Sequence, residues 1–438
     1  MIKHTAYTRR RFMKQSATSL GVIGLPYLIP ASALGLGGQI APSNRITLGV
    51  IGTGGRGLDL IKMFFRQPDA QIVAVCDVDK EHREKAQGII NEQYGNKDCA
   101  LFSDFRQLIA RPDIGAVIVA TPDHWHALAT IAALNAGKDV FCEKPLANSV
   151  AEGRAICEAV KKNNRVLQTG SHERSGPNAR FACELVRSGK IGKLQTIRIN
   201  LPCTDKHHLE IRQVTEVPPP EPIPVGFDYD FWLGHTPEVP YTPKRCHFYW
   251  RFILNYGGGE MTDRGAHVID IGQLGAGTDD TGPVEIQAIG VPGTGLYNAL
   301  WDYHFINTYA NGMQMIGEAA GPRGLKFEGS EGWIFVHIHG AKLEAEPTSL
   351  LAEKPESLQV QLGRTDSHPR NFLDAVKSRK QPFAHAEVGH RTASICHLNN
   401  IAMRLGRRLK WDPVREQVIG DDEANRLLAP VMRSPWSL

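Results

Sequence analysis

A glycine-rich turn near the start of the chain limits its possible folds more than any other feature. The turn, residues 52–57, has the sequence GTGGRG and follows an apolar segment, residues 46–51, that predicts a buried strand. A helical segment opens at its last glycine. A strand, a G-x-G-x-x-G turn and a helix in this order are typical of a Rossmann domain, in which the turn receives the pyrophosphate of a dinucleotide.

The spacing predicts a separate structural role for three glycines of the turn. The first permits a tight bend, the second lets the backbone approach the pyrophosphate, and the third lets helix and strand pack closely. Twenty residues after Gly57, a second apolar segment ends at Asp77, whose carboxylate can bind ribose hydroxyls and would repel a 2′-phosphate. We therefore expect NAD rather than NADP. The turn residues expected at the cofactor are Gly52, Gly54, Gly55, Arg56 and Gly57.

The rest of the chain divides into two parts. Apolar and helical segments alternate up to about residue 166, which predicts a Rossmann domain over residues 45–166. Beyond Thr169 the pattern changes to a helix at residues 179–188, a strand at 194–201, a proline-rich and aromatic insert, and alternating strands between residues 284 and 338. Residues 167–438 are therefore expected to form an α+β domain with a large, mainly antiparallel open sheet.

The N-terminus resembles a twin-arginine signal peptide. Arg9, Arg10 and Arg11 precede a modestly apolar stretch that ends in an A-x-A sequence at residues 31–33. We expect a signal over residues 1–33, a linker over 34–44, and export to the periplasm; an uncleaved membrane anchor is the alternative. Without residues 1–33 the chain holds 45 basic and 46 acidic residues, which gives no reason to expect nucleic-acid binding.

Two further strand ends carry polar side chains that could meet the cofactor. Thr121, Asp123 and His126 follow the strand expected at residues 116–120, at the edge of the sheet where ligands of open α/β folds bind. Asp123 could instead cap the next helix. The strand expected at residues 140–142 is followed by Glu143, Lys144 and Pro145. Pro145 favours an extended Lys144, whose ammonium could stabilise a developing alkoxide; a solvated pair with Glu143 is the alternative.

With the Glu143-Lys144-Pro145 sequence in place, the chain resembles the glucose-fructose oxidoreductase, inositol dehydrogenase and MocA family. A second hallmark agrees: residues 257–270 are similar to the family's glycine-led helix, in which Asp263 and His267 complete the site with Lys144. Asp263, His267 and Asp270 are spaced to share one helix face. The segment at residues 227–234 is typical of an exported subgroup.

The resemblance implies roles for these side chains. His267 would take a hydroxyl proton, and Asp263 would orient substrate or support the charge that forms. Helix capping is the alternative for Asp263, and a buried partner of His267 is the alternative for Asp270. A metal held by these two acids and His267 was weighed, and no metal site is expected. The substrate candidates are Arg174, Trp250 and Arg251.

These residues imply an NAD-dependent oxidoreductase that removes hydride from a ring carbon of a sugar, glycoside or cyclitol. Two alternatives stay open: an NAD-dependent glycosidase or lyase that works by transient oxidation and elimination, and a non-catalytic NAD- or carbohydrate-binding protein. The cofactor is expected to be tightly bound, because a periplasm offers no ready dinucleotide pool. Relatives imply a homo-oligomer, a dimer or tetramer.

Overall fold

The computed structural model describes residues 44–340 and 342–438. The expected signal peptide and nearly all of the expected linker lie outside the described residues, so those predictions are not addressed by the structure. The described chain from Ile46 to Leu438 forms one compact unit.

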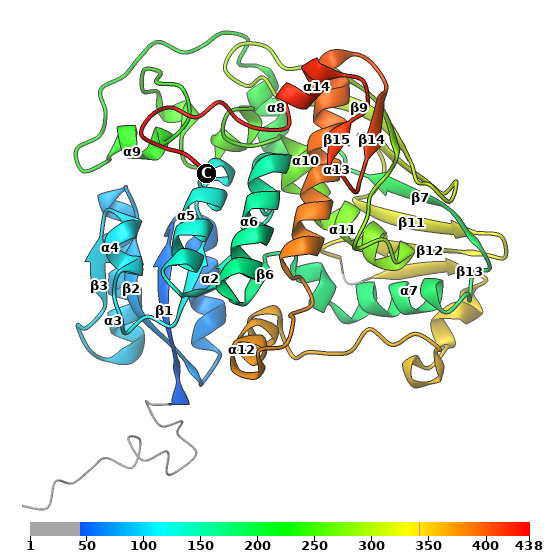
Figure 1. Cartoon of the computed structure of the whole chain (residues 1–438), viewed down its shortest axis with the longest axis horizontal. Coiled ribbons are helices and arrows are strands. Elements are labelled where there is room, and N and C mark those ends of the chain that lie inside the picture. Colours follow the sequence, from blue (N-terminus) through cyan, green and yellow to red (C-terminus); the bar gives the residue numbers. More distant parts are fainter. Residues whose placement is uncertain (1–43, 341) are drawn as a thin grey trace, which may run out of the picture. The chain divides into compact units, whose positions relative to one another are not determined.

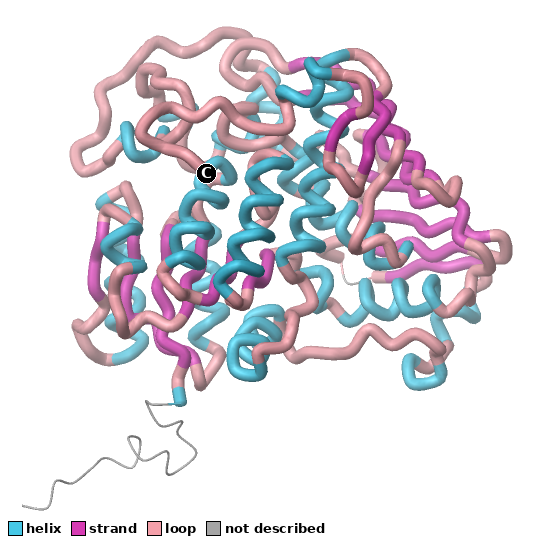
Figure 2. The backbone as a smooth tube through the Cα atoms, in the orientation of Figure 1, coloured by secondary structure: helices cyan, strands magenta, loops and turns pink. Residues whose placement is uncertain are grey.

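The first sheet is fully parallel and has the strand order of a Rossmann domain. Its order is β3-β2-β1-β4-β5-β6, and every neighbouring pair runs parallel. The strands are mostly buried because helices cover both faces (Figures 1 and 2). The sequence missed only the short strand β3. The strands are β1 (Ile46–Ile51), β2 (Ala70–Cys76), β3 (Ala100–Phe102), β4 (Ala116–Val119), β5 (Asp139–Cys142) and β6 (Leu167–Thr169).

Two separate cores hold the helices against this sheet. One contains apolar side chains of α4, α5 and α6 with one set of strand residues. The other contains side chains of α2 and α3 with the alternate set, and it also includes α12 from the end of the chain. The C-terminal part of the protein is thus anchored on the Rossmann domain. The helices are α2 (Gly55–Phe65), α3 (Lys80–Tyr94), α4 (Phe105–Ile109), α5 (Asp123–Asn135), α6 (Val150–Asn163) and α12 (His368–Ser378).

The second domain has a nine-stranded mixed sheet with the order β13-β12-β11-β7-β10-β9-β8-β14-β15. Only the β7–β10 pair is parallel, so the expected α+β domain with a mainly antiparallel sheet is confirmed. Its strands are β7 (Leu194–Asn200), β8 (Glu285–Pro292), β9 (Leu300–Thr308), β10 (Gln314–Glu318), β11 (Gly324–Gly329), β12 (Trp333–His337), β13 (Leu343–Glu346), β14 (Leu409–Asp412) and β15 (Gln417–Val418).

Three helices pack on this sheet, and a long insert leads into one of them. The helices α7 (Pro177–Arg187), α11 (Gly265–Ala276) and α13 (Ala386–Leu405) share a single apolar core with the strands. The insert joins β7 to α11 and contains α8 (Lys206–Arg212), α9 (Tyr229–Leu233) and α10 (Glu260–Asp263). It returns to the Rossmann domain, because Lys80 donates its N–H to the Gly226 carbonyl and Asp228 donates to Val78.

One predicted helix is broken. The sequence placed Asp263, His267 and Asp270 on one face of a continuous helix, but α10 ends at Asp263 and α11 begins at Gly265. Arg264 is the cap between them. Asp263 and His267 therefore lie on two consecutive helices, and their directions follow from tertiary packing.

The eight cysteines all lie in the described residues, and none forms a disulfide. Seven of the thiols are buried, and that of Cys157 is partly buried. Among the helices of the described residues, none combines the length and apolarity needed to cross a bilayer.

Candidate active site

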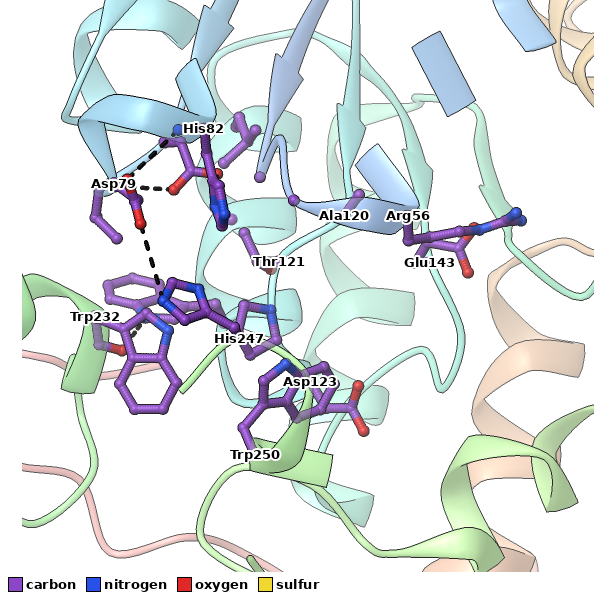
Figure 3. A pocket seen from close by; sticks show the side chains of 18 of the residues that line it. Arg56, Asp79, His82, Ala120, Thr121, Asp123, Glu143, Trp232, His247 and Trp250 are labelled. Atoms are coloured by element: carbon purple, nitrogen blue, oxygen red, sulfur yellow. Dashed lines mark hydrogen bonds and ion pairs between the residues drawn. The ribbon is translucent and has the colours of Figure 1, made fainter. Parts of the chain in front are cut away.

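A cavity of about 540 Å³ lies where the carboxyl ends of the Rossmann strands meet the insert (Figure 3). The glycine turn forms one wall. Gly52 has a φ of 85°, which favours glycine, and a Cβ on Gly57 would lie 2.1 Å from the Gly52 carbonyl oxygen. A Cβ on Gly55 would meet nothing within 4 Å. The turn is thus tightly packed at Gly52 and Gly57 and has open space at Gly55. This arrangement fits a pyrophosphate at the N-terminus of α2.

Asp77 is built into the turn as a charged group. Its carboxylate accepts hydrogen bonds from the Thr53 N–H at 2.7 Å and from the Asp79 N–H at 2.9 Å. Burial raises the pKa of Asp77, but bonds from His82, Asp79 and Thr53 outweigh burial and lower it. The Thr53 hydroxyl donates a third hydrogen bond at 3.1 Å. A carboxylate has about four acceptor positions, so one remains for a ribose hydroxyl. This arrangement fits NAD and disfavours a 2′-phosphate.

The residues after β4 fall into two groups. Asp123 and Thr121 line the cavity, and among the described residues the buried Thr121 hydroxyl has no hydrogen-bond partner, which suits contact with a ligand. Asp123 does not cap α5, because that helix shows no side-chain cap bond. Burial raises the pKa of Asp123 well above its usual range. His126 lines the wall, but its ring nitrogens contact the carbonyls of Pro145 at 2.7 Å and Thr121 at 3.0 Å, so it fixes two loops.

The Lys144 side chain forms hydrogen bonds with the second domain. Its Nζ donates to the Asp263 side chain and to the Asp263 carbonyl, both at 2.7 Å. Glu143 does not hold this ammonium, because its carboxylate accepts from Arg56 Nε at 2.7 Å. The alternative of a solvated Lys144–Glu143 pair is therefore wrong. The Arg56–Glu143 pair joins the glycine turn to the end of β5, beside the cavity (Figure 3).

Asp263 is the negative centre of this end of the cavity. Burial raises its pKa, but Lys144 and then Arg251 outweigh burial and hold the pKa far below its usual range. Arg251 Nε lies 3.6 Å from Asp263 Oδ1, and its guanidinium lies over the Trp250 ring at 4.5 Å. Trp250 and Arg251 both line the cavity. The helix-capping alternative for Asp263 is wrong, because its side chain bonds Lys144.

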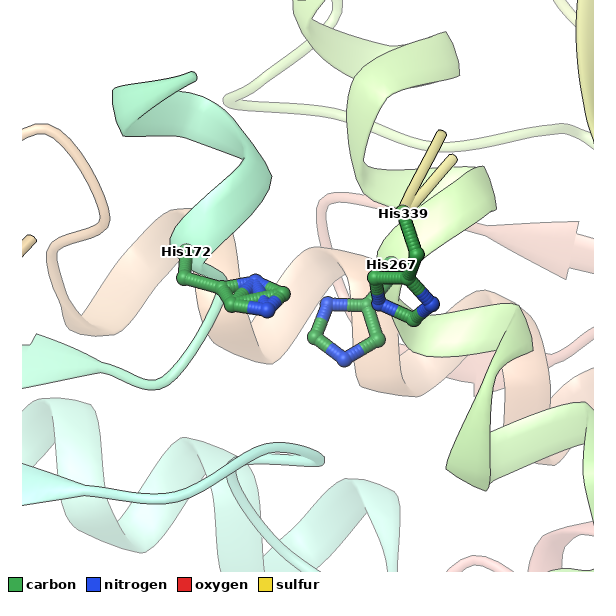
Figure 4. Close-up of side chains that lie close together, drawn as sticks. All are labelled: His172, His267 and His339. Carbon is green, nitrogen blue, oxygen red and sulfur yellow. The ribbon is translucent and has the colours of Figure 1, made fainter. Parts of the chain in front are cut away.

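His267 lies on α11 next to this pair. It is 5% exposed, and burial, followed by the charge of Lys144, lowers the pKa of its ring well below the usual value. The imidazole is thus neutral. It stacks on His172 with ring centroids 4.6 Å apart, and His339 lies 5.0 Å away (Figure 4).

The sequence suggests Arg174 as a substrate contact, but its side chain does not line the cavity. Its buried guanidinium donates to the Asp270 carboxylate at 2.8 Å and to Asp279 at 2.7 Å. Arg174 therefore holds α11 in place and has no free face for a substrate. Asp270 also accepts from the Thr392 hydroxyl, and in the described residues it shows no bond to His267.

Sequence reasoning missed His172 and His339. His172 lies two residues before Arg174, the expected substrate residue. His339 follows β12 in a turn, more than seventy residues after His267. No spacing rule links these three histidines, because the packing of the segment after β6, of α11 and of the turn after β12 brings them together.

Comparison with known proteins agrees with this geometry. Residues 46–171 match the family model described as oxidoreductase family, NAD-binding Rossmann fold. Residues 179–438 match the model described as oxidoreductase family, C-terminal alpha/beta domain. The chain belongs to the Gfo/Idh/MocA oxidoreductase family.

Individual Gfo/Idh/MocA relatives match over parts of their length. An inositol 2-dehydrogenase of Rubrobacter xylanophilus is 37% identical over 152 residues, which cover 34% of this chain and 42% of that protein. A glycosyl hydrolase family 109 protein of Solibacter usitatus is 32% identical over 193 residues, which cover 43% and 44% of the two chains. The chain thus matches less than half the length of either relative.

The fold recurs in solved structures of low identity. The aldose-aldose oxidoreductase from Caulobacter crescentus, complexed with glycerol, has a TM-score of 0.61 at 19% identity. The match covers 84% of this chain and 99% of that one. At this identity the match supports the two-domain architecture alone.

Proposed function

We propose that the protein is an NAD-dependent oxidoreductase that removes hydride from a CH–OH carbon of a sugar, glycoside or cyclitol. The observation that carries the proposal is the 2.7 Å contact between Lys144 Nζ and Asp263. It puts a paired ammonium from the segment after β5 and a carboxylate from the second domain in the cavity that also contains the glycine turn. A cavity that served only to bind a dinucleotide would have no need of this pair.

The chain's own residues supply binding and proton chemistry. When bound, NAD accepts the hydride. Lys144 donates a hydrogen bond to the substrate oxygen and stabilises the negative charge that develops there. Asp263 orients the ammonium, and Arg251 supports Asp263. The neutral ring of His267 accepts the hydroxyl proton.

The insert favours a cofactor that stays bound. Phe227 forms a bridge with Asp79 directly beside the expected ribose site. Trp232 and Trp250 are buried side chains that line the cavity (Figure 3). Release of a dinucleotide would have to disturb these contacts. A retained cofactor must be reoxidised in place. A second sugar can do this, or the hydride can return to an oxidised intermediate.

We propose that the twin-arginine segment exports the protein with its cofactor already bound. The support is the sequence at residues 8–14 and a cofactor cavity that forms only in the folded chain, since this export route carries folded proteins. We also propose a homo-oligomer, as the family resemblance implies.

Retained cofactor and product analysis test the function. The purified protein is denatured to release bound dinucleotide, and the native protein is offered a panel of sugars and glycosides without added NAD. Reduced nicotinamide absorbance with an oxidised sugar supports the oxidoreductase. Release of an aglycone without net reduction identifies the glycosidase alternative. Retained dinucleotide with no change in any sugar leaves only a binding protein and contradicts the proposal.

A further inference from the structure

Three histidines from separate parts of the chain meet beside the proposed reaction site. His172 begins the short 3-10 helix after β6, His267 lies on α11, and His339 follows β12 (Figure 4). Each offers one ring nitrogen, and the three nitrogens lie within 4.8 Å of one another. Ligands about 2.1 Å from a tetrahedral zinc ion lie about 3.4 Å apart. Rotation of the rings, including the stacked rings of His172 and His267, would therefore bring all three nitrogens onto one ion.

Two histidines of this cluster have a buried ring nitrogen without a hydrogen-bond partner among the described residues. These atoms are Nδ1 of His172 and Nδ1 of His267, and elsewhere His124 and His235 share the property singly. In contrast, His126, His368 and His397 each contact a backbone carbonyl at 3.0 Å or less. A buried polar atom without a partner is destabilising. Two rings with such atoms in one cluster of three histidines indicate a ligand.

The surrounding charges allow a cation. Two positive side chains lie near enough to affect His267, but each is paired with a carboxylate. Glu173 Oε1 lies 3.8 Å from His339 Nε2, and it also accepts the His339 N–H at 3.2 Å. A carboxylate beside a ligand histidine is a common way to orient the ring in metal sites. The paired cations are Lys144, with Asp263, and Arg56, with Glu143.

We propose that His172, His267 and His339 bind a divalent transition-metal ion such as Zn²⁺, with an open position for an oxygen of the substrate. Three imidazoles and one open position are the ligand set of several catalytic zinc sites. Binding of the ion does not depend on the proposed function. Only the identity of that oxygen rests on it. In the loaded protein, the lone pair of His267 is used by the ion. The ion would then polarise the hydroxyl, whose proton would pass to water as bound NAD takes up the hydride.

Two other clusters in the described residues have suitable spacing, but their atoms are in use. In the cluster of Asp205, His207 and His208, Asp205 pairs with two arginines and His208 contacts Glu260 at 3.1 Å. The cluster of Asp79, His82 and His247 lies in the cofactor cavity, and Asp79 caps α3. The first of these provides a matched control.

The test measures metal binding directly. The purified protein with its retained dinucleotide is stripped with a chelator and titrated with Co²⁺, whose visible absorption reports nitrogen ligands. Elemental analysis after Zn²⁺ loading gives the stoichiometry. One ion per chain is expected. Failure to retain any ion, with the protein folded, would overturn the proposal.

Two variants locate the ion. His339 has a φ of 63°, a conformation that asparagine tolerates, so His339→Asn should keep the turn. We expect it to weaken Co²⁺ binding at least about tenfold and to change the absorption bands. His207→Gln should bind like the wild type. Unchanged affinity in His339→Asn, or loss of binding in His207→Gln, assigns the ion elsewhere and rejects this site.

The outcomes separate the two proposals. Metal binding with no oxidation of any sugar keeps the metal site and rejects the function. Sugar oxidation by a stripped protein that takes up no metal keeps the function and rejects the metal site.

Discussion

The two ends of the cavity are built in different ways. The cofactor end is made mostly by one short segment, in which the turn at residues 52–57 and Asp77 are joined by hydrogen bonds from Thr53. The other end takes Lys144 from the segment after β5 and Asp263 from α10, and three histidines from separate elements lie behind this pair, outside the cavity lining. The geometry of a local motif is set by residues that are close together in the chain. An assembled site depends on packing far away, such as the Arg174–Asp270 pair that holds α11.

The largest expected effect is at the assembled end. Lys144→Met removes the charge that would stabilise the substrate oxygen, so turnover should fall by roughly 10³-fold or more. Retained dinucleotide should stay near the wild-type amount, because the glycine turn is untouched. Steady-state rates and nicotinamide content measure the two effects. Lys162→Met, an exposed change on α6, is the control. A variant that lost cofactor and kept its turnover per bound cofactor would show that Lys144 serves the cofactor end.

The buried ion pair should matter for stability rather than for substrate affinity. Arg174→Met leaves Asp270 buried without its main partner, and we expect a loss of about 3–5 kcal/mol in unfolding free energy. Denaturant unfolding measures it. The double variant Arg174→Met, Asp270→Leu should recover part of the loss. If KM rises tenfold while stability is unchanged, Arg174 contacts substrate after all.

One methyl group added at Gly57 should disrupt the cofactor end of the cavity. Gly57→Ala places a Cβ 2.1 Å from the Gly52 carbonyl oxygen, so the backbone must move, at a cost of about 1–3 kcal/mol. We expect loss of retained dinucleotide and a lower Tm. Gly88→Ala on α3, where a Cβ meets nothing within 4 Å, should keep both. Normal cofactor content in Gly57→Ala would mean that the turn does not hold a pyrophosphate.

The smallest effect concerns Glu152, a buried acid outside both ends. Burial raises the pKa of Glu152 to about 7. The raised value means that its contribution to stability is complete below the unfolded pKa and is lost as the pH rises through about 7. Glu152→Gln cannot ionise, so its stability relative to the wild type should increase by about 1 kcal/mol between pH 6 and pH 8. Thermal unfolding at both pH values measures this difference. A pH-independent difference would place the carboxyl in contact with water.

The sequence alone determined the parts of the protein that short-range physics controls. The strand, the glycine turn, the helix and Asp77 lie within some thirty residues, and each step follows from apolar spacing and backbone freedom. It also determined the mainly antiparallel second sheet from the alternation beyond residue 284. Lys144 and Asp263 were found through family resemblance, since the spacing of Lys144 by itself favoured a solvated side chain.

Tertiary structure alone decided which side chains share the reaction site. It broke the expected helix at Arg264, turned Arg174 away from the cavity toward Asp270, and brought His172 and His339 to His267. Contacts between residues far apart in the chain depend on how the sheets and helices pack, and no local periodicity records that packing. The histidine cluster therefore became visible only when β6, α11 and β12 were in place.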